Sequence, residues 1–327
     1  MELNVAFLIF NRPEATRVVF EAIRAARPDR LFIVADGPRA NKKGEAERCA
    51  AARRIVDNGV DWRCIVHRRY SDSNLGCRRN VSTGLGWVFE LAEHCIVLED
   101  DCVPEPSFFP YCQALLAAYR NDARVMAISG NNFQRGGKRT QYSYYFSDMA
   151  HVWGWASGRR AWQKYDAEMK LWPEIKSGNW LRDLLADEEE VRFWTRCFDM
   201  CAAGLDTWDF QWLFACWVNR GLCILPSVNL ISNIGFDRAE ATHTTNPEDP
   251  WANLPRQAIS LPLLDPPFVI RDRDADRFTF RNHFRAPLPK RLRQRLARIG
   301  FLRFLVRRWR ARLRPHGGSV TGSPSRS

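Results

Sequence analysis

The first hundred residues alternate short apolar runs with segments of helical periodicity, and this alternation constrains the fold most strongly. The apolar runs are "NVAFLIF" (4–10), "RLFIVADG" (30–37), "CIVHRRY" (64–70) and "CIVLED" (95–100). The segment "RPEATRVVFEAIRAA" between the first two places apolar residues at helical spacing, and "NVSTGLGWVFELA" predicts a second helix. Strands separated by helices of this length predict an α/β fold, Rossmann-like, with a mostly parallel central sheet flanked by helices on both faces.

Polar residues follow three of these predicted strands. Asn11 and Arg12 follow the first strand, Asp36 follows the second, and three consecutive carboxylates at 99–101 follow the fourth. In open parallel sheets, ligands bind at the carboxyl ends of the strands. We therefore expect these side chains to converge on one site.

The acidic triplet consists of Glu99, Asp100 and Asp101. Mg²⁺ and Mn²⁺ prefer oxygen ligands and often take one or two carboxylates, with water and substrate phosphates completing the shell. Three adjacent carboxylates repel one another unless a cation neutralises them, so the triplet predicts a divalent metal site. The alternative that the pattern leaves open is a solvated turn with charged residues.

Six segments in order resemble a known family. They are "FLIFNRPEATRVVFEAI", "LFIVADGPR", "CIVLEDDCVPEPSFFPYC", "GWASGRRAW", "WDFQW" and "GLCILPSVNLISNIG". Together, over roughly residues 4–245, they resemble GT-A-fold glycosyltransferases, in particular the N-acetylglucosaminyltransferase I family and bacterial glycosyltransferase family 2-like proteins. The resemblance implies a GT-A fold and a sugar transfer from a nucleotide-sugar donor, most often a UDP-sugar, with Mn²⁺ or Mg²⁺ as cofactor.

The resemblance also implies roles for individual residues. Asp101 matches the direct metal ligand, while Glu99 and Asp100 match acids that lie against the ribose and sugar of the donor. Arg12 matches the arginine that contacts the nucleotide sugar and its phosphates, and Asp36 matches the acid that reads the base. These five residues are therefore the expected metal and donor site.

Inverting sugar transfer needs a group that removes a proton from the acceptor hydroxyl, and a carboxylate within hydrogen-bond reach suffices. The resembling family has this base in a "W-D-D-W" stretch, and "TWDFQW" here makes Asp209 the candidate. Phe210 replaces the second acid of that stretch, and Asp206 lies slightly upstream as an alternative base. A further alternative is that Asp209 only caps the helix that follows it.

Other residues near these motifs have open interpretations. Arg78 or Arg79 is either a phosphate clamp or part of a solvated helix start. The tryptophans of "HVWGWASGRRAW" form either a sugar shelf or core packing, and core packing is the preferred interpretation for Trp162. His243 reaches a phosphate or the metal in one interpretation and is uninvolved in the other.

The basic excess of the chain is concentrated near its C-terminus. The net charge is +12, and residues 286–314 hold eleven positive charges and no acidic residue, so the remainder carries about +1. This segment also places apolar residues and Trp309 at helical spacing, which is typical of a helix that lies on an anionic membrane surface. Docking of a partner protein and nucleic-acid binding are the alternatives. The nearly neutral remainder argues against nucleic acid.

The start of the sequence reads directly into a strand, and the ten cysteines do not follow a secretory signal. We therefore expect free thiols and a cytoplasmic location, at the inner face of a bacterial membrane. Cys197 and Cys201 lie one helical turn apart without further ligands at metal spacing, so thiols in the core or at the surface are the better interpretation.

The sequence thus predicts a metal-dependent glycosyltransferase, hexosyl or N-acetylhexosaminyl, that acts on a glycan or lipid-linked acceptor in bacterial surface glycan assembly. The predicted organisation is a GT-A domain over 1–285, a basic helical tail over 286–314 and a disordered end over 315–327. Within the domain, 1–135 is the nucleotide-sugar half and 136–285 the acceptor half. A sugar-nucleotide nucleotidyltransferase and a catalytically degenerate membrane scaffold are the alternatives.

Overall fold

The computed structural model describes residues 1–185, 187–236 and 250–285, and residues 1–283 form one compact unit. The predicted tail at 286–314, the end at 315–327 and His243 lie outside the described residues. Within the described ranges, no helix is both long enough and apolar enough to cross a membrane. The predicted domain boundaries stay predictions.

The helices and strands follow the predicted alternation in the first half of the chain. The strands are β1 (Asn4–Ile9), β2 (Arg30–Ala35), β3 (Ile65–Tyr70), β4 (His94–Glu99), β5 (Cys102–Pro104), β6 (Val125–Ser129), β7 (Tyr144–Ser147), β8 (Trp155–Gly158), β9 (Leu222–Pro226) and β10 (Ile231–Asn233). The helices are α1 (Pro13–Ala26), α2 (Glu45–Gly59), α3 (Cys77–Leu91), α4 (Phe108–Ala118), α5 (Arg159–Trp162), α6 (Trp172–Ser177), α7 (Leu181–Leu184), α8 (Glu188–Ala202), α9 (Asp209–Val218) and α10 (Arg273–Thr279), followed by a π-helical turn at Phe280–Phe284.

In the described part of the chain, eight strands form one sheet in the order β3-β2-β1-β4-β8-β6-β9-β7, and β5 pairs with β10 in a separate small sheet. The strands β3, β2, β1 and β4 are mutually parallel, as are β6 and β9, whereas β8 and β7 run antiparallel to their neighbours. The predicted mostly parallel α/β sheet is confirmed. The sheet continues through both predicted halves because β8, from the second half, lies between β4 and β6.

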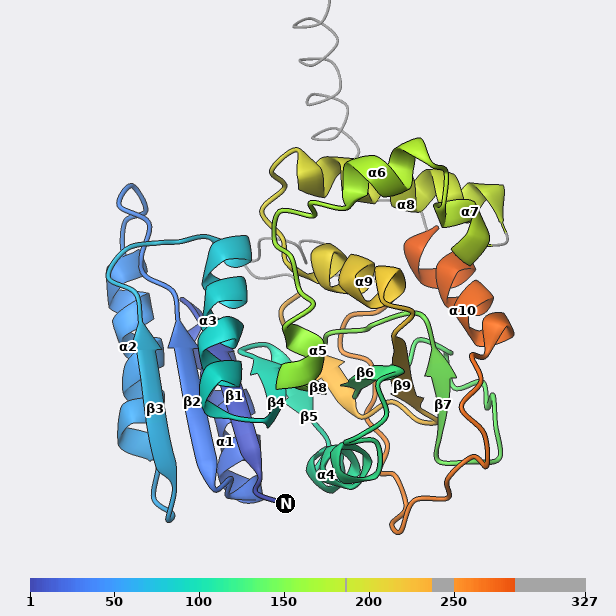
Figure 1. The fold of residues 1–327 in the computed structure, drawn as a ribbon. Coiled ribbons are helices and arrows are strands. Elements are labelled where there is room, and N and C mark those ends of the chain that lie inside the picture. Colours follow the sequence, from blue (N-terminus) through green and yellow to red (C-terminus); the bar gives the residue numbers. More distant parts are fainter. Residues whose placement is uncertain (186, 237–249, 286–327) are drawn as a thin grey trace, which may run out of the picture. The chain divides into compact units, whose positions relative to one another are not determined.

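Alternate residues of each strand face opposite sides of the sheet, so the sheet has two cores. Odd-numbered residues of β1 and β2 pack against apolar residues of α1, α2 and α4. Even-numbered residues of the same strands pack against α3 and α9. Figure 1 shows α3 on one side of the strands β1 to β3 and α1 and α2 on the other.

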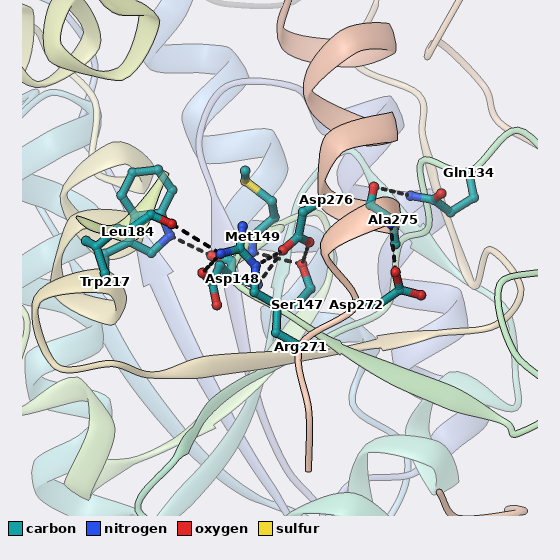
Figure 2. A network of polar contacts seen from close by, with 10 residues as sticks. All are labelled: Gln134, Ser147, Asp148, Met149, Leu184, Trp217, Arg271, Asp272, Ala275 and Asp276. Carbon is teal, nitrogen blue, oxygen red and sulfur yellow. Dashed lines mark hydrogen bonds and ion pairs between the residues drawn. The ribbon is translucent and has the colours of Figure 1, made fainter. Parts of the chain in front are cut away.

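A buried polar network joins α10 to the edge strand β7 (Figure 2). The Asp276 carboxylate accepts hydrogen bonds from the Ser147 hydroxyl and the backbone N–H of Asp148, and Arg271 pairs with Asp276 at 2.5 Å and with Asp148 at 2.6 Å. Burial raises the pKa of Asp148 to about 6, although Arg271 lowers it in part. The backbone of Arg271 also forms an isolated parallel β-bridge with Phe146 of β7. The segment before α10 therefore covers this edge of the sheet.

Two glycines of α3 allow a matched test of how this helix packs. We expect Gly84→Ala to lower the free energy of unfolding by about 1–3 kcal/mol, because a β-carbon there would lie 2.4 Å from Cγ1 of Val34 in β2. Gly86→Ala is the control, since nothing lies within 4 Å of the added carbon. It should be neutral or raise the free energy of unfolding by up to about 1 kcal/mol. Urea unfolding measures both variants, and equal destabilisation would contradict the close contact between α3 and β2.

Candidate functional site

The acidic triplet lies where β4 ends and the chain turns into β5. Strand β10 pairs with β5, and the backbone N–H of Ile234 donates to the Asp101 carbonyl at 2.8 Å. The next residue, Gly235, lies so close to the triplet that a β-carbon would be 2.1 Å from Oδ2 of Asp101. The small sheet therefore brings the segment after β10 directly against the Asp101 carboxylate, and only glycine fits there.

Arg12 neutralises part of the triplet from the end of β1. Its Nη1 lies 2.5 Å from Oδ2 of Asp101 and 3.6 Å from Oδ1 of Asp100. The backbone N–H of Phe10 also donates to Asp100 at 3.1 Å. Burial lowers the pKa of Arg12, but the two aspartates raise it by more, so the guanidinium stays charged. The protein therefore supplies part of the positive charge that the triplet needs, and the divalent metal site stays a prediction.

The position of Arg12 follows from the start of α1. Pro13 occupies the first helical position, where its fixed φ and missing N–H are favourable. Arg12 is the N-cap residue, and its carbonyl accepts a hydrogen bond from the Thr16 hydroxyl at 2.8 Å. Because β1 pairs with β4 in parallel register, this turn and the triplet end at the same edge of the sheet.

Glu99 is the last residue of β4 and is half-buried. Burial raises its pKa above the usual range, and the charges of Asp101 and Asp100 raise it further, while Arg12 opposes them. The charge of Asp209, from the second half of the chain, also raises the pKa of Glu99. The candidate base therefore lies within electrostatic reach of the triplet.

Asp36 is buried at the end of β2, and both oxygens of its carboxylate accept hydrogen bonds from the protein. Oδ1 accepts from the backbone N–H groups of Gly37 and Leu75, and Oδ2 accepts from the N–H of Gly76 and the side-chain amide of Asn74, all at 2.8–3.1 Å. A carboxylate has about four acceptor sites, so these four bonds fill it. In this structure Asp36 holds the loop before α3, and its direct contact with a base stays a prediction.

Asp209 is the first residue of α9, and its carboxylate accepts a hydrogen bond from the Thr207 hydroxyl. Trp208 occupies the N-cap position, where no side-chain capping bond forms, so the capping interpretation of Asp209 is not supported. The carboxylate still lies at the positive end of the helix dipole. Asp206, the alternative base, instead accepts hydrogen bonds from the backbone N–H groups of Cys77 and Arg78 at the start of α3.

The structure also places the other residues that the motifs singled out. Trp155 and Trp162 are buried and pack against each other, which confirms the core interpretation of Trp162. Trp153 is half-buried and packs edge-on against Phe133 with ring centres 5.2 Å apart. Arg78 pairs with the exposed Glu168 at 2.5 Å.

Two residues near Asp209 were not predicted. Thr207 bonds the carboxylate of Asp209, and Cys77 starts α3. Burial raises the pKa of the Cys77 thiol well above its usual range, and the carboxylates of Glu99 and Asp209 add to this effect. The sequence does show Thr207 two residues before the candidate base, where its hydroxyl can reach the carboxylate. Nothing in the local pattern singles out Cys77.

The donor atoms of the triplet fit a hard divalent cation, because they are carboxylate oxygens at the edge of the sheet. In the described ranges, no group of three or more His, Cys, Asp or Glu side chains is arranged to hold a metal ion by itself. A site that takes one carboxylate from the protein and the rest from phosphates and water does not need such a group. All ten cysteines are free thiols, as expected.

A cavity of about 270 Å³ lies elsewhere, among His94, Tyr119 and Gly158. His94 is the first residue of β4 and Glu99 is the last, so this cavity lies at the opposite edge of the sheet, roughly 16 Å away along the strand. It is not part of the acidic site.

A comparison with known proteins gives a partial similarity in sequence. No family model matches the chain. Over 89 residues the chain is 33% identical to an alpha-1,3-mannosyl-glycoprotein 2-beta-N-acetylglucosaminyltransferase from Arabidopsis thaliana. The match covers 27% of this chain and only 19% of the length of that relative. The chain is thus similar to part of an N-acetylglucosaminyltransferase.

Solved structures show only distant likeness. An apo UDP-glucose pyrophosphorylase has a TM-score of 0.32 and 10% identity, over 68% of this chain and 90% of that one. A 4-diphosphocytidyl-2C-methyl-D-erythritolsynthase from Anaerococcus prevotii has a TM-score of 0.29 and 10% identity, over 50% and 76%. HddC from Yersinia pseudotuberculosis, complexed with GMP-PN, has a TM-score of 0.29 and 8% identity, over 48% and 77%. Likeness at this level carries no argument about activity.

The pairing of Arg12 with the triplet can be tested against an exposed arginine at the other end of α1. We expect Arg12→Ala to lower the free energy of unfolding by about 3 kcal/mol in the presence of EDTA, because it leaves buried carboxylates without their counter-charge. Arg24→Ala is the control, since the side chain of Arg24 is 44% exposed and its pairs with Asp61 and Glu21 lie at the surface. It should cost less than about 1 kcal/mol.

Urea unfolding at low salt measures this difference. If the two variants lose the same stability, Arg12 is not the counter-charge of the triplet. Added Mn²⁺ should also stabilise Arg12→Ala more than it stabilises Arg24→Ala, because the cation then replaces the missing charge.

Proposed function

We propose that the protein is a metal-dependent, inverting glycosyltransferase that transfers a hexosyl or N-acetylhexosaminyl group from a UDP-sugar to an acceptor hydroxyl. The observation that carries the proposal is that Arg12, which follows β1, pairs with the carboxylates that end β4. The charge of Asp209, the first residue of α9, adds to the raised pKa of Glu99, which agrees with a base near the triplet. The partial similarity to an N-acetylglucosaminyltransferase supports the same reaction class.

On the donor side, Asp101 would hold the metal ion with one carboxylate oxygen. Its Oδ1 accepts a weak hydrogen bond from the Cys102 thiol at 3.4 Å, while Oδ2 accepts one from Arg12. The chemistry that Mn²⁺ or Mg²⁺ supplies when bound is stabilisation of the negative charge on the departing diphosphate. Arg12 adds a second positive charge at the same place, and its guanidinium geometry suits phosphate oxygens.

Around the donor, Glu99 and Asp100 would lie against the ribose and sugar hydroxyls. Asp36 would act on the nucleotide side through the loop at 74–76, whose amide groups it holds. This assignment keeps Asp36 near the base without requiring a free acceptor on its carboxylate.

On the acceptor side, Asp209 would accept the proton of the attacking hydroxyl. The bond from the Thr207 hydroxyl orients Oδ1 of this carboxylate, and the other oxygen would take the proton. A base on the face opposite the departing nucleotide leads to inversion at the sugar carbon, and such proton transfer contributes about 10²–10⁴-fold in rate.

We also propose that the enzyme works at the inner face of a bacterial membrane, on a glycan or lipid-linked acceptor in surface glycan assembly. The support is the cluster of eleven positive charges in residues 286–314, which lie outside the described ranges. Anionic lipids attract such a segment by about 1 kcal/mol per basic residue near the surface. No nucleic-acid partner is proposed.

Donor binding tests the metal site. In calorimetry with UDP and a panel of UDP-sugars, we expect the wild type to bind a donor with Mn²⁺ and to lose at least about tenfold in affinity with EDTA. Asp101→Asn should lose the Mn²⁺ dependence, because an amide binds a hard cation more weakly than a carboxylate does. Asp183→Asn, at an exposed position of α7, is the matched control and should bind like the wild type.

The other outcomes separate the alternatives. If no nucleotide binds the wild type under any metal condition, the transferase proposal fails. Release of pyrophosphate from UTP and a sugar 1-phosphate would favour a nucleotidyltransferase. Metal and nucleotide binding without any turnover would favour a degenerate scaffold.

The base is tested separately. We expect Asp209→Asn to bind the donor within about twofold of the wild type and to release UDP from it at least about 100-fold more slowly, because the amide keeps the shape and the Thr207 bond but removes the proton acceptor. Initial rates of UDP release, with water or an added sugar alcohol as acceptor, measure this. A variant with full activity would exclude Asp209 as the base.

A further inference from the structure

We propose that Asp206 is a positioning residue: it fastens the loop that carries Asp209 to the amino end of α3, and so holds the base in register with the donor side of the site. This inference rests on the proposed function, because it concerns the placement of the proposed base. It deepens that function by naming what joins the two halves of the site.

Four consecutive backbone N–H groups at the start of α3 are bound by two carboxylates. Asp36 accepts from Leu75 at 2.8 Å and from Gly76 at 3.1 Å, through its two oxygens. Asp206 accepts from Cys77 at 3.1 Å and from Arg78 at 2.8 Å, also through its two oxygens. The first N–H groups of a helix have no partner inside the helix, so such bonds satisfy donors that would otherwise need water.

The capping carboxylate comes from far along the chain. The local N-cap residue of α3 is Gly76, which has no side chain to accept these bonds, and Asp206 lies 128 residues beyond Arg78. Gly76 has a φ of +83°, and a β-carbon there would lie 2.8 Å from Oδ2 of Asp206. The glycine therefore both permits this backbone conformation and leaves room for the carboxylate. A negative charge at this end of the helix is also favourable with respect to the helix dipole.

The next three residues connect this cap to the base. Thr207 follows Asp206 directly, and its hydroxyl donates to Asp209. Trp208 is buried and stacks on Trp155 with ring centres 5.6 Å apart. The loop is thus held at two points, by Trp208 in the core and by Asp206 on α3, and Asp209 follows both.

The same neighbourhood appears in the electrostatics of the Cys77 thiol. Burial has the largest effect and raises the pKa of the thiol. The charges of Glu99, Asp209 and Asp206 raise it further, in that order. A residue of α3 thus lies within reach of the end of the triplet, the base and the cap at once. The amino end of α3 is the place where the two halves of the site meet.

The hydrogen bonds of Asp206 to α3 should affect the rate of the reaction more than the affinity for the donor. A general base must lie within about 2.6–3.2 Å of the proton that it takes, and a displacement of about 1 Å can cost roughly 100-fold in rate. On the donor side, the N–H groups of the loop at 74–76 are held by Asp36, and Arg12 pairs with Asp101, whereas Asp206 bonds the next two amides, those of Cys77 and Arg78. Loss of the cap should therefore lower kcat and leave donor affinity nearly unchanged.

The test compares Asp206→Ala, Asp206→Asn and, as control, Asp183→Ala at an exposed position of α7. Donor affinity is measured by calorimetry with Mn²⁺ and a UDP-sugar, kcat by UDP release, and opening of the helix end by amide hydrogen exchange at Cys77 and Arg78. We expect Asp206→Ala to lower kcat by about 10- to 100-fold, with donor affinity within about twofold of the wild type. Exchange at the two amides should become faster.

Asp206→Asn is the conservative variant, since its side-chain oxygen can accept one of the two bonds. It should recover part of kcat and part of the protection from exchange, and it serves as the test if the alanine variant does not fold. If exchange becomes faster but kcat does not change, Asp206 only caps α3. That result would contradict this inference and leave the proposed function untouched. If the wild type neither binds nor turns over any UDP-sugar, the proposed function fails, and the role of Asp206 fails with it.

Discussion

Burying carboxylates at the end of a strand is costly unless positive charge or hydrogen-bond donors reach them, and this constraint organises the whole acidic edge of the sheet. Arg12 supplies the charge for Asp101 and Asp100 because the parallel pairing of β1 with β4 ends both strands together. The backbone N–H of Phe10 adds a donor to Asp100. Without this register, the triplet would have no counter-charge from β1.

The same principle explains the other carboxylates around the site. Asp36 and Asp206 are each satisfied by backbone N–H groups at the start of α3, so neither needs a cation. Asp209 takes a hydroxyl donor from Thr207 instead. Asp36 and Asp206 thus fix the backbone at the start of α3, whereas Asp100 and Asp101 pair with Arg12 and Asp209 bonds Thr207. This division follows from where helix ends and strand ends meet in space.

How far the site could be predicted depends on the residue. The expected convergence of the strand ends occurs for Arg12 and the triplet, because parallel strands bring their carboxyl ends to one edge. The sequence did not indicate that Arg12 would neutralise the triplet, since the two are almost ninety residues apart and no local pattern pairs them. The position of β8 between β4 and β6 was not predicted for the same reason.

The sequence by itself determined the alternation of strands and helices in the first half, the parallel sheet and the polar residues at its carboxyl edge. These follow from local periodicity, which each segment carries without its neighbours. Only the tertiary structure decided that the loop at 74–76 donates hydrogen bonds to the Asp36 carboxylate. It also decided that Asp206 caps a helix whose bonded residue, Arg78, lies 128 residues away. The hydrogen-bonding partner of a side chain depends on which backbone groups packing leaves unsatisfied, and that is a property of the folded chain.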